Sequence, residues 1–279
     1  MCAMPLAAPV KRWAWVVVLF AGVGLYLLVL RRLEDTQDPT YVPPMVFLAG
    51  TIVPATFVAL AVGRRGRWGA IGGTLLAAAA GLGALLGIAV TIKLSYDTLR
   101  QLTVPQMVAV SLVEEALKLF VPAVAVGIWR ARRNPVDGLV VGVSIGLGFA
   151  ALETMAHAFT TLLASQGNVG PVEQLLFLRG LIAPAAHAAW TGVACGALWR
   201  MASSPRASTV LRFVGTFFAA VALHAVWDGL HRILGYAIVG VVSVAWLLWE
   251  LRTARVESQR TTTSASPEGA LTGGRGSAG

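Results

Sequence analysis

Charged residues and cysteines are both scarce in this sequence. Only 13% of its 279 residues are charged, against roughly 25% in typical soluble domains. This deficit excludes an ordinary soluble globular domain. The two cysteines, Cys2 and Cys195, are far apart, which excludes both a disulfide framework and a cysteine-based metal cluster.

Acidic residues are the scarcer of the charged types, and the formal net charge is +9. In a soluble protein this charge would suggest binding to nucleic acid. Here the basic residues stand between long apolar runs, where they act as topology signals at the cytoplasmic face of a membrane. We therefore expect contact with a lipid bilayer and no nucleic-acid partner.

Long apolar runs dominate what is present, since 57% of the residues are hydrophobic. Each run is close to the ~20 residues needed to cross a bilayer, and together they predict an all-α polytopic transmembrane helical bundle. The first run follows Lys11 and Arg12 and is long for a cleaved signal, so we expect a retained anchor. About eight spans are predicted, near residues 13–30, 42–62, 70–92, 105–129, 136–157, 175–199, 211–231 and 233–250.

The loops between these runs predict an orientation. Arginine and lysine cluster at 63–69, 130–135 and 200–210, whereas the 158–174 loop has no basic residue. By the positive-inside rule both termini are cytoplasmic, and we expect an integral protein of the plasma membrane. Residues 253–279 are rich in Thr, Ser, Gly and Ala, which predicts a disordered cytoplasmic tail.

A stripe of small residues marks one face of the fifth span. Gly138, Gly142, Gly146 and Ala150 recur every four residues, a pattern that lets transmembrane helices approach closely. Glu153 follows at helical spacing on the same face. We therefore expect Glu153 to point at protein and not at lipid.

A few ionisable residues interrupt the central spans. Each costs roughly 2.5–3.5 kcal/mol at the middle of a membrane helix, so these residues must be paired or must line a wet cavity. Arg179, Glu173, His157 and His231 lie nearer span ends, where water or snorkelling satisfies them. The central set comprises Glu114, Glu115, Lys118, Glu153, His187, His224 and Asp228.

The sequence accounts for one local pair within this set. Glu114 and Lys118 are four residues apart with the acid first, the favourable order for an ion pair on a helix. Glu115, Glu153 and the two histidines have no such local partner. With the predicted topology, the glutamates and histidines all fall in the outer half of the membrane, which indicates one shared site.

Two glutamates with two histidines are suited to hydrolysis. A carboxylate in a low-dielectric cavity can take a proton from water, and imidazoles can orient that water or donate to an oxyanion. No GxSxG or HExxH motif is present. The residues alone leave three classes open: a hydrolase, a proton-coupled transporter and a non-catalytic scaffold.

Four short motifs resemble those of the PrsW-type intramembrane proteases, relatives of the CAAX-processing and bacteriocin-processing membrane proteases. They are "EEALK" at 114–118, "GFAALE" at 148–153, "HAAWTGVACG" at 187–196 and "HAVWD" at 224–228. The resemblance divides the chain into accessory transmembrane helices (1–104), a protease core (105–231), a last transmembrane helix (232–252) and the tail (253–279).

The resemblance implies a glutamate-dependent membrane endopeptidase that cuts single-pass membrane proteins such as anti-sigma factors. It places Glu114, Glu115, Glu153, His187 and His224 in the catalytic motifs. We expect Glu114 to be the general base supported by Glu115, His187 to position the water, Glu153 to orient a histidine, and His224 to polarise the scissile carbonyl. Lys118 and Asp228 are expected to play supporting roles.

Two features of the motifs bear on the mechanism. CAAX-type relatives tend to have Asn where this chain has Asp228, so we assign Asp228 to orienting His224 and not to a direct oxyanion contact. From the same relatives we favour no cofactor and a glutamate-activated water. The alternative is zinc held by His187, His224 and one of the paired glutamates, with Glu115 as the third ligand. A non-proteolytic scaffold or chaperone of the same fold and a transporter remain the rival functions.

Overall fold

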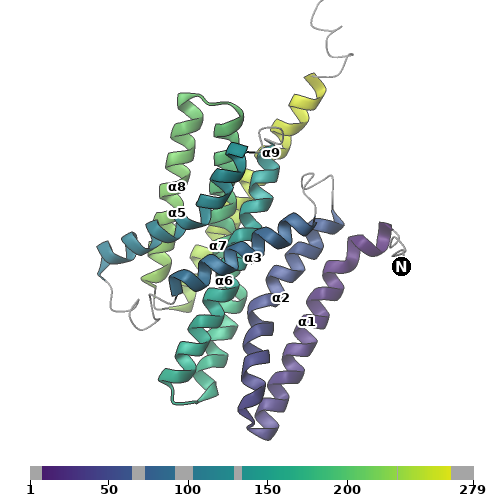
Figure 1. The fold of residues 1–279 in the computed structure, drawn as a ribbon, viewed down its shortest axis with the longest axis vertical. Helices are drawn as coiled ribbons and strands as arrows, with labels where there is room; N and C mark the ends of the chain where they lie inside the picture. The colour runs from purple at the N-terminus through teal and green to yellow at the C-terminus, as the bar shows by residue number, and fades with distance from the viewer. Residues whose placement is uncertain (1–7, 65–72, 92–102, 129–133, 231, 265–279) are drawn as a thin grey trace, which may run out of the picture.

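A computed structural model describes residues 8–64, 73–91, 103–128, 134–230 and 232–264 of the chain (Figure 1). The described residues contain helices and no strand. The elements are α1 (Ala8–Thr36), the 3₁₀ turn η1 (Pro39–Tyr41), α2 (Val42–Gly63), α3 (Gly73–Thr91), α5 (Val104–Ile128), α6 (Pro135–Ala164), α7 (Val169–Ser203), α8 (Ala207–Asp228) and α9 (Ile233–Ser264).

Among the described residues, six helical segments are long and apolar enough to cross a membrane: Arg12–Thr36, Pro39–Gly63, Pro135–Ala164, Val169–Ser203, Ala207–Asp228 and Ile233–Gln259. Helices satisfy their own backbone hydrogen bonds, which a lipid environment requires. In α3 the described apolar part is shorter, Leu75–Leu86, and α5 carries three charged residues near its middle. The predicted all-α polytopic bundle is confirmed, and its number of spans agrees approximately.

The centre of the bundle is the antiparallel pair α6 and α7. Asn134 and Asn168 begin these two helices, each accepting a hydrogen bond from a backbone N–H two residues on. A tight turn joins the helices, in which Gln166 and Gly167 have positive φ angles of 54° and 88°. This turn reverses the chain so that α7 returns along α6.

The predicted small-residue stripe lies at the α6–α7 contact. A Cβ added to Gly142 would meet the backbone of Thr191, and one added to Gly146 would overlap the carbonyl oxygen of His187. The glycines therefore bring the two backbones together, as expected for transmembrane helices with small residues at the interface. Because Glu153 lies further along the same helix, it is buried at this interface.

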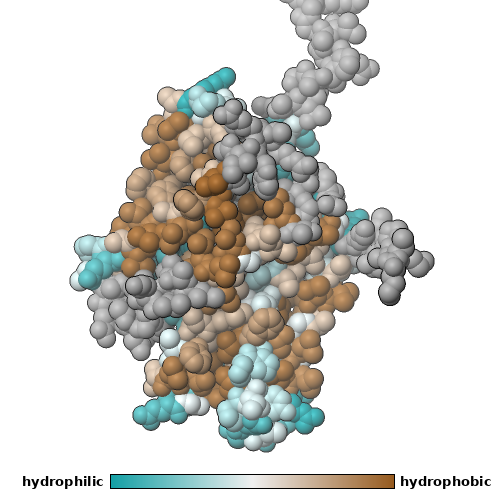
Figure 2. Space-filling view, viewed as in Figure 1, coloured by the Kyte–Doolittle hydropathy of each residue, from teal (hydrophilic) through white to brown (hydrophobic). Residues whose placement is uncertain are grey.

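The remaining helices flank this pair. In Figure 1, α5 and α8 lie on one side of α6 and α7, and α1 and α2 lie on the other. Large apolar side chains on the flanking helices are exposed, among them Phe20, Leu85, Leu211 and Val241. Figure 2 shows a hydrophobic surface across the middle of the molecule with hydrophilic residues at its ends, as a membrane-embedded protein requires.

The prediction that a disordered tail begins at residue 253 is wrong for residues 253–264. Helix α9 continues to Ser264, because the extension makes contacts with neighbouring elements. Arg200 Nε donates to Glu257 Oε2 at 2.8 Å, and Ser258 Oγ donates to Asn134 Oδ1 at 2.8 Å. Residues 265–279 lie outside the described residues, as do His231 and most of the predicted basic loops at 63–69 and 130–135.

Candidate active site

Helix α5 carries Glu114, Glu115 and Lys118 into the bundle interior, and all three are buried. Lys118 Nζ lies 2.7 Å from Glu115 Oε1 and 3.8 Å from Glu114 Oε2. The predicted partner of Lys118 was Glu114, so the main ion pair differs from the prediction. Glu115 Oε1, the closer partner, also contacts His224 on α8, while the Lys118 ammonium group reaches His187 on α7.

His187 on α7 lies between Lys118 and Glu153. Lys118 Nζ is 3.0 Å from His187 Nδ1, and His187 Nε2 is 3.2 Å from Glu153 Oε2. An ammonium group can only donate, so Nδ1 must accept and the ring hydrogen belongs on Nε2, facing the carboxylate. Lys118 Nζ lies over the face of the Phe149 ring, 3.9 Å from the ring centroid. This is a favourable position for a cation.

His224 on α8 is surrounded by carboxylates. Its Nδ1 is 2.9 Å from Glu115 Oε1, and its Nε2 is 3.5 Å from Glu114 Oε2 and 3.7 Å from Asp228 Oδ2. The Trp190 ring stacks on the imidazole with centroids 4.9 Å apart. Both ring nitrogens of His224 therefore face acids, and its plane is held by an aromatic neighbour.

Glu153 on α6 has three basic neighbours. Arg179 Nη2 lies 2.8 Å from its carboxylate, His187 Nε2 lies 3.2 Å away and His157 Nε2 lies 3.4 Å away. We expected Arg179 and His157 to be satisfied at span ends, but both are buried here. A signal for each is present in the sequence, since His157 is four residues after Glu153 and Arg179 is eight before His187, which places each on the same helix face as its neighbour.

The structure thus brings together every predicted site residue from four helices. Glu114, Glu115 and Lys118 come from α5, Glu153 from α6, His187 from α7, and His224 and Asp228 from α8. The links run in an unbroken series of contacts from Glu114 through His224, Glu115, Lys118 and His187 to Glu153. Such a buried series can hold a proton donor, a proton acceptor and an oxyanion donor at fixed separations.

One group of these residues suits a metal ion by type and spacing. The ligand atoms of Glu115, His187 and His224 lie within 4.8 Å of one another, and all three residues are buried. Two imidazoles and a carboxylate form a known zinc set. Lys118, however, already lies at hydrogen-bond distance from Glu115 and His187. The ammonium group therefore competes with a metal ion for Glu115 Oε1 and His187 Nδ1, whereas Glu115 Oε2, His187 Nε2 and His224 Nε2 have no hydrogen-bond partner within the described part of the chain.

Comparison with known proteins identifies the family. A family model described as "PrsW family intramembrane metalloprotease" matches residues 54–250, which include every residue of the site. No curated protein and no solved structure gave a match. The matched region covers well over half of the chain and agrees with the four motifs and their convergence on one buried cluster. The chain belongs to the PrsW family of intramembrane metalloproteases.

Proposed function

We propose that this protease hydrolyses a peptide bond in or beside the span of a single-pass membrane protein, using a water activated by Glu114. The observation that carries the proposal is the convergence of Glu114 and Glu115 on α5 with His187 on α7 and His224 on α8 into one buried cluster. Isolated ionisable residues in a membrane are costly. That these two glutamates and two histidines point toward one another at a similar predicted depth in the membrane is expected of a reaction centre.

Glu114 is the best-placed base. Its Oε2 is buried and makes no hydrogen bond within the described part of the chain, so it can accept one from a water. Glu114 takes a proton from this water while the water oxygen attacks the carbonyl carbon and the carbonyl π electrons move to oxygen. His224 donates a hydrogen bond to that oxyanion. Glu114 then passes its proton to the amide nitrogen as the C–N bond breaks, leaving a carboxylic acid and an amine.

The remaining residues of the cluster position Glu114 and His224. Glu115 fixes His224 through the 2.9 Å contact and is itself held by Lys118 at 2.7 Å. His187, with its hydrogen on Nε2, is oriented by Glu153 on one side and by Lys118 on the other. Asp228 lies one turn from His224 on the same helix and orients its ring. These fixed partners keep the base and the oxyanion donor in place before substrate arrives.

We further propose that Lys118, and not a metal ion, neutralises this centre, although the family is described as one of metalloproteases. A metal would be held by Glu115, His187 and His224. The ammonium of Lys118 instead occupies the space between Glu115 and His187. It supplies a fixed positive charge beside the water and leaves Glu114 to act as the base.

The predicted topology indicates the side of attack. Arg200 and Arg206 flank the turn from α7 to α8, whereas the turn from α6 to α7, residues 165–168, has no basic residue. The positive-inside rule then places the first turn and both termini in the cytoplasm, with the chain in the plasma membrane. The site lies toward the other face, which suits a substrate with an extracytoplasmic part, such as an anti-sigma factor.

The test compares the protein fragments present in membranes of cells that express the wild type, Glu114→Gln or Glu34→Gln. Glu34 is exposed on α1 and serves as the matched control for loss of one carboxylate. We expect the wild type and Glu34→Gln to produce the same new protein termini and Glu114→Gln to produce none while accumulating normally. Identical fragments from Glu114→Gln and the wild type would favour the scaffold or transporter and overturn the proposal.

A further inference from the structure

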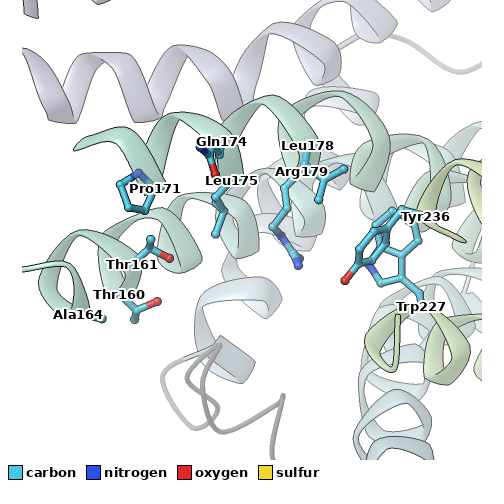
Figure 3. Close-up of a pocket in the computed structure, with 10 residues that line it drawn as sticks. All are labelled: Thr160, Thr161, Ala164, Pro171, Gln174, Leu175, Leu178, Arg179, Trp227 and Tyr236. Carbon is cyan, nitrogen blue, oxygen red and sulfur yellow. The ribbon is translucent and has the colours of Figure 1, made fainter. Parts of the chain in front are cut away.

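A cavity of about 360 Å³ opens beside the site between four helices. Its walls come from the end of α6, the beginning of α7, the last turn of α8 and the first turns of α9. Figure 3 shows Thr160 and Thr161 on one helix facing Gln174 and Arg179 on its neighbour, with Trp227 and Tyr236 at the far end. A cavity of this size lies at the lower end of the range that holds small ligands, so it can accept a side chain with some adjacent backbone.

Arg179 connects this cavity to the buried cluster. One edge of its guanidinium group contacts Glu153, with Nη2 2.8 Å from Oε2. Its Nε is buried and has no hydrogen-bond partner within the described part of the chain. A guanidinium carries five N–H donors, and Arg179 lines the cavity. It can therefore contact Glu153 through Nη2 and donate to a bound group through Nε.

The aromatic end of the cavity leads to the same cluster. Trp227 contacts the Tyr236 ring edge-on at 4.6 Å between centroids, and it contacts Trp190 at 6.1 Å. Trp190 in turn stacks on His224. A group bound in the cavity is thus separated from Glu153 by Arg179 alone. It is separated from His224 by the rings of Trp227 and Trp190.

Arg179 is already paired with Glu153, but its unsatisfied Nε and the other donors of the cavity favour a group that accepts hydrogen bonds, above all an anion. Arg179 is the one charged side chain among the described residues that line it, and the other polar groups are threonine hydroxyls, the Gln174 amide and the tyrosine hydroxyl. A buried guanidinium pairs best with a carboxylate, which it can bind through two parallel hydrogen bonds. In a polypeptide substrate the corresponding group is an aspartate or glutamate side chain.

We propose that this cavity is a substrate subsite in which Arg179 binds an acidic side chain of the polypeptide near the scissile bond. The inference rests on the proposed proteolytic function and adds a specificity residue to it. Arg179 contacts Glu153, and Glu153 contacts His187. Binding of a group in the subsite therefore affects the residues that position the water. An acid in the subsite therefore aids both binding and alignment of the substrate.

The test measures binding and does not require cleavage. Two fluorescein-labelled peptides that differ only by Asp or Asn at one position are titrated against the full-length Glu114→Gln chain in detergent, with anisotropy as the readout. Since hydrogen bonds to charged groups contribute about 1.5–3 kcal/mol, we expect the Asp peptide to bind about tenfold tighter or more. Arg179→Gln should abolish this preference, and Arg179→Lys should keep part of it.

Two further variants separate the subsite from folding. Arg232→Gln removes an exposed arginine at the beginning of α9 and should leave the preference intact. Thr161→Trp fills the cavity from the α6 wall and should weaken binding of both peptides. Equal binding of the two peptides, no binding of either, or an Asp preference that survives Arg179→Gln would overturn the subsite. Absence of cleavage by a wild-type chain that shows the Asp preference would count against the proposed function alone.

Discussion

At the residue scale, the two adjacent glutamates of α5 have different surroundings and therefore different roles. Glu115 is held by Lys118 and by His224 Nδ1 at 2.7 and 2.9 Å. The closest contacts of Glu114 are longer, at 3.5 and 3.8 Å. A carboxylate with short ionic contacts is a structural anchor, whereas one whose contacts are longer is more available to water.

This difference predicts that isosteric substitutions of the two glutamates differ in how much stability they cost. Glu115→Gln leaves the buried Lys118 ammonium without its main counter-charge, which costs about 3–5 kcal/mol in buried pairs. Glu114→Gln removes a less tightly bound charge, so it should abolish cleavage with a much smaller loss of stability. Thermal unfolding in detergent, measured beside cleavage, distinguishes them. Equal destabilisation by both variants would contradict the assignment of Glu115 as the anchor.

A second residue-scale prediction concerns metal. Since the Lys118 ammonium lies against Glu115 Oε1 and His187 Nδ1 and would repel a cation there, the wild type should purify with much less than one zinc per chain and keep its activity in a strong chelator. Lys118→Ala frees Glu115 and His187 and should gain zinc affinity while losing activity and some stability. Elemental analysis measures the zinc directly. Stoichiometric zinc in the wild type, with activity lost on chelation and restored by zinc, would reverse the proposal.

At the element scale, the contact between α6 and α7 decides whether the site assembles. Gly146 brings the α6 backbone against the carbonyl of His187, and the same approach places Glu153 beside His187. The close packing of small residues supplies the contact between these two helices. The distance between Glu153 and its imidazole thus depends on a glycine two turns away.

Gly146→Leu should separate the two helices and displace His187. Overpacking of this kind typically costs about 1–3 kcal/mol, and a displaced His187 should lower cleavage more strongly than the loss of stability alone explains. Gly24→Leu is the control, because a Cβ added to Gly24 on α1 meets nothing within 4 Å. Unfolding temperature and cleavage are measured together. Full activity of Gly146→Leu would show that the α6–α7 distance does not control the site.

At the scale of the whole molecule, the position of the site predicts where substrates are cut. The turn between α6 and α7 and the beginning of α9 lie at the end of the bundle that we place outside the cytoplasm, and the site is toward that end. The cut should therefore fall at the outer boundary of the substrate's span or in its extracytoplasmic stub. Sequencing the new terminus of a product measures this. A cut in the cytoplasmic third of the span would contradict the proposed topology and the depth of the site together.

The sequence by itself determined the class of protein and the residues of the cluster. Apolar runs of membrane length predicted the helical bundle, and seven ionisable residues stood out because charge in a membrane helix is costly. The motifs around them indicated the family that the match over residues 54–250 confirms. These features are local, so spacing along one chain is enough to detect them.

Only the tertiary structure decided which of these residues are partners. Spacing predicted Glu114 as the ion-pair partner of Lys118. The orientation of α5 relative to α7 and α8 instead brings Lys118 against Glu115 and His187. Arg179 joins Glu153 because α6 and α7 pack closely over their length. Helix α9 extends past residue 253 because Arg200 and Asn134 bind its last turns. Each outcome depends on the rotation and depth of one helix against another, and periodicity within a single helix does not encode either.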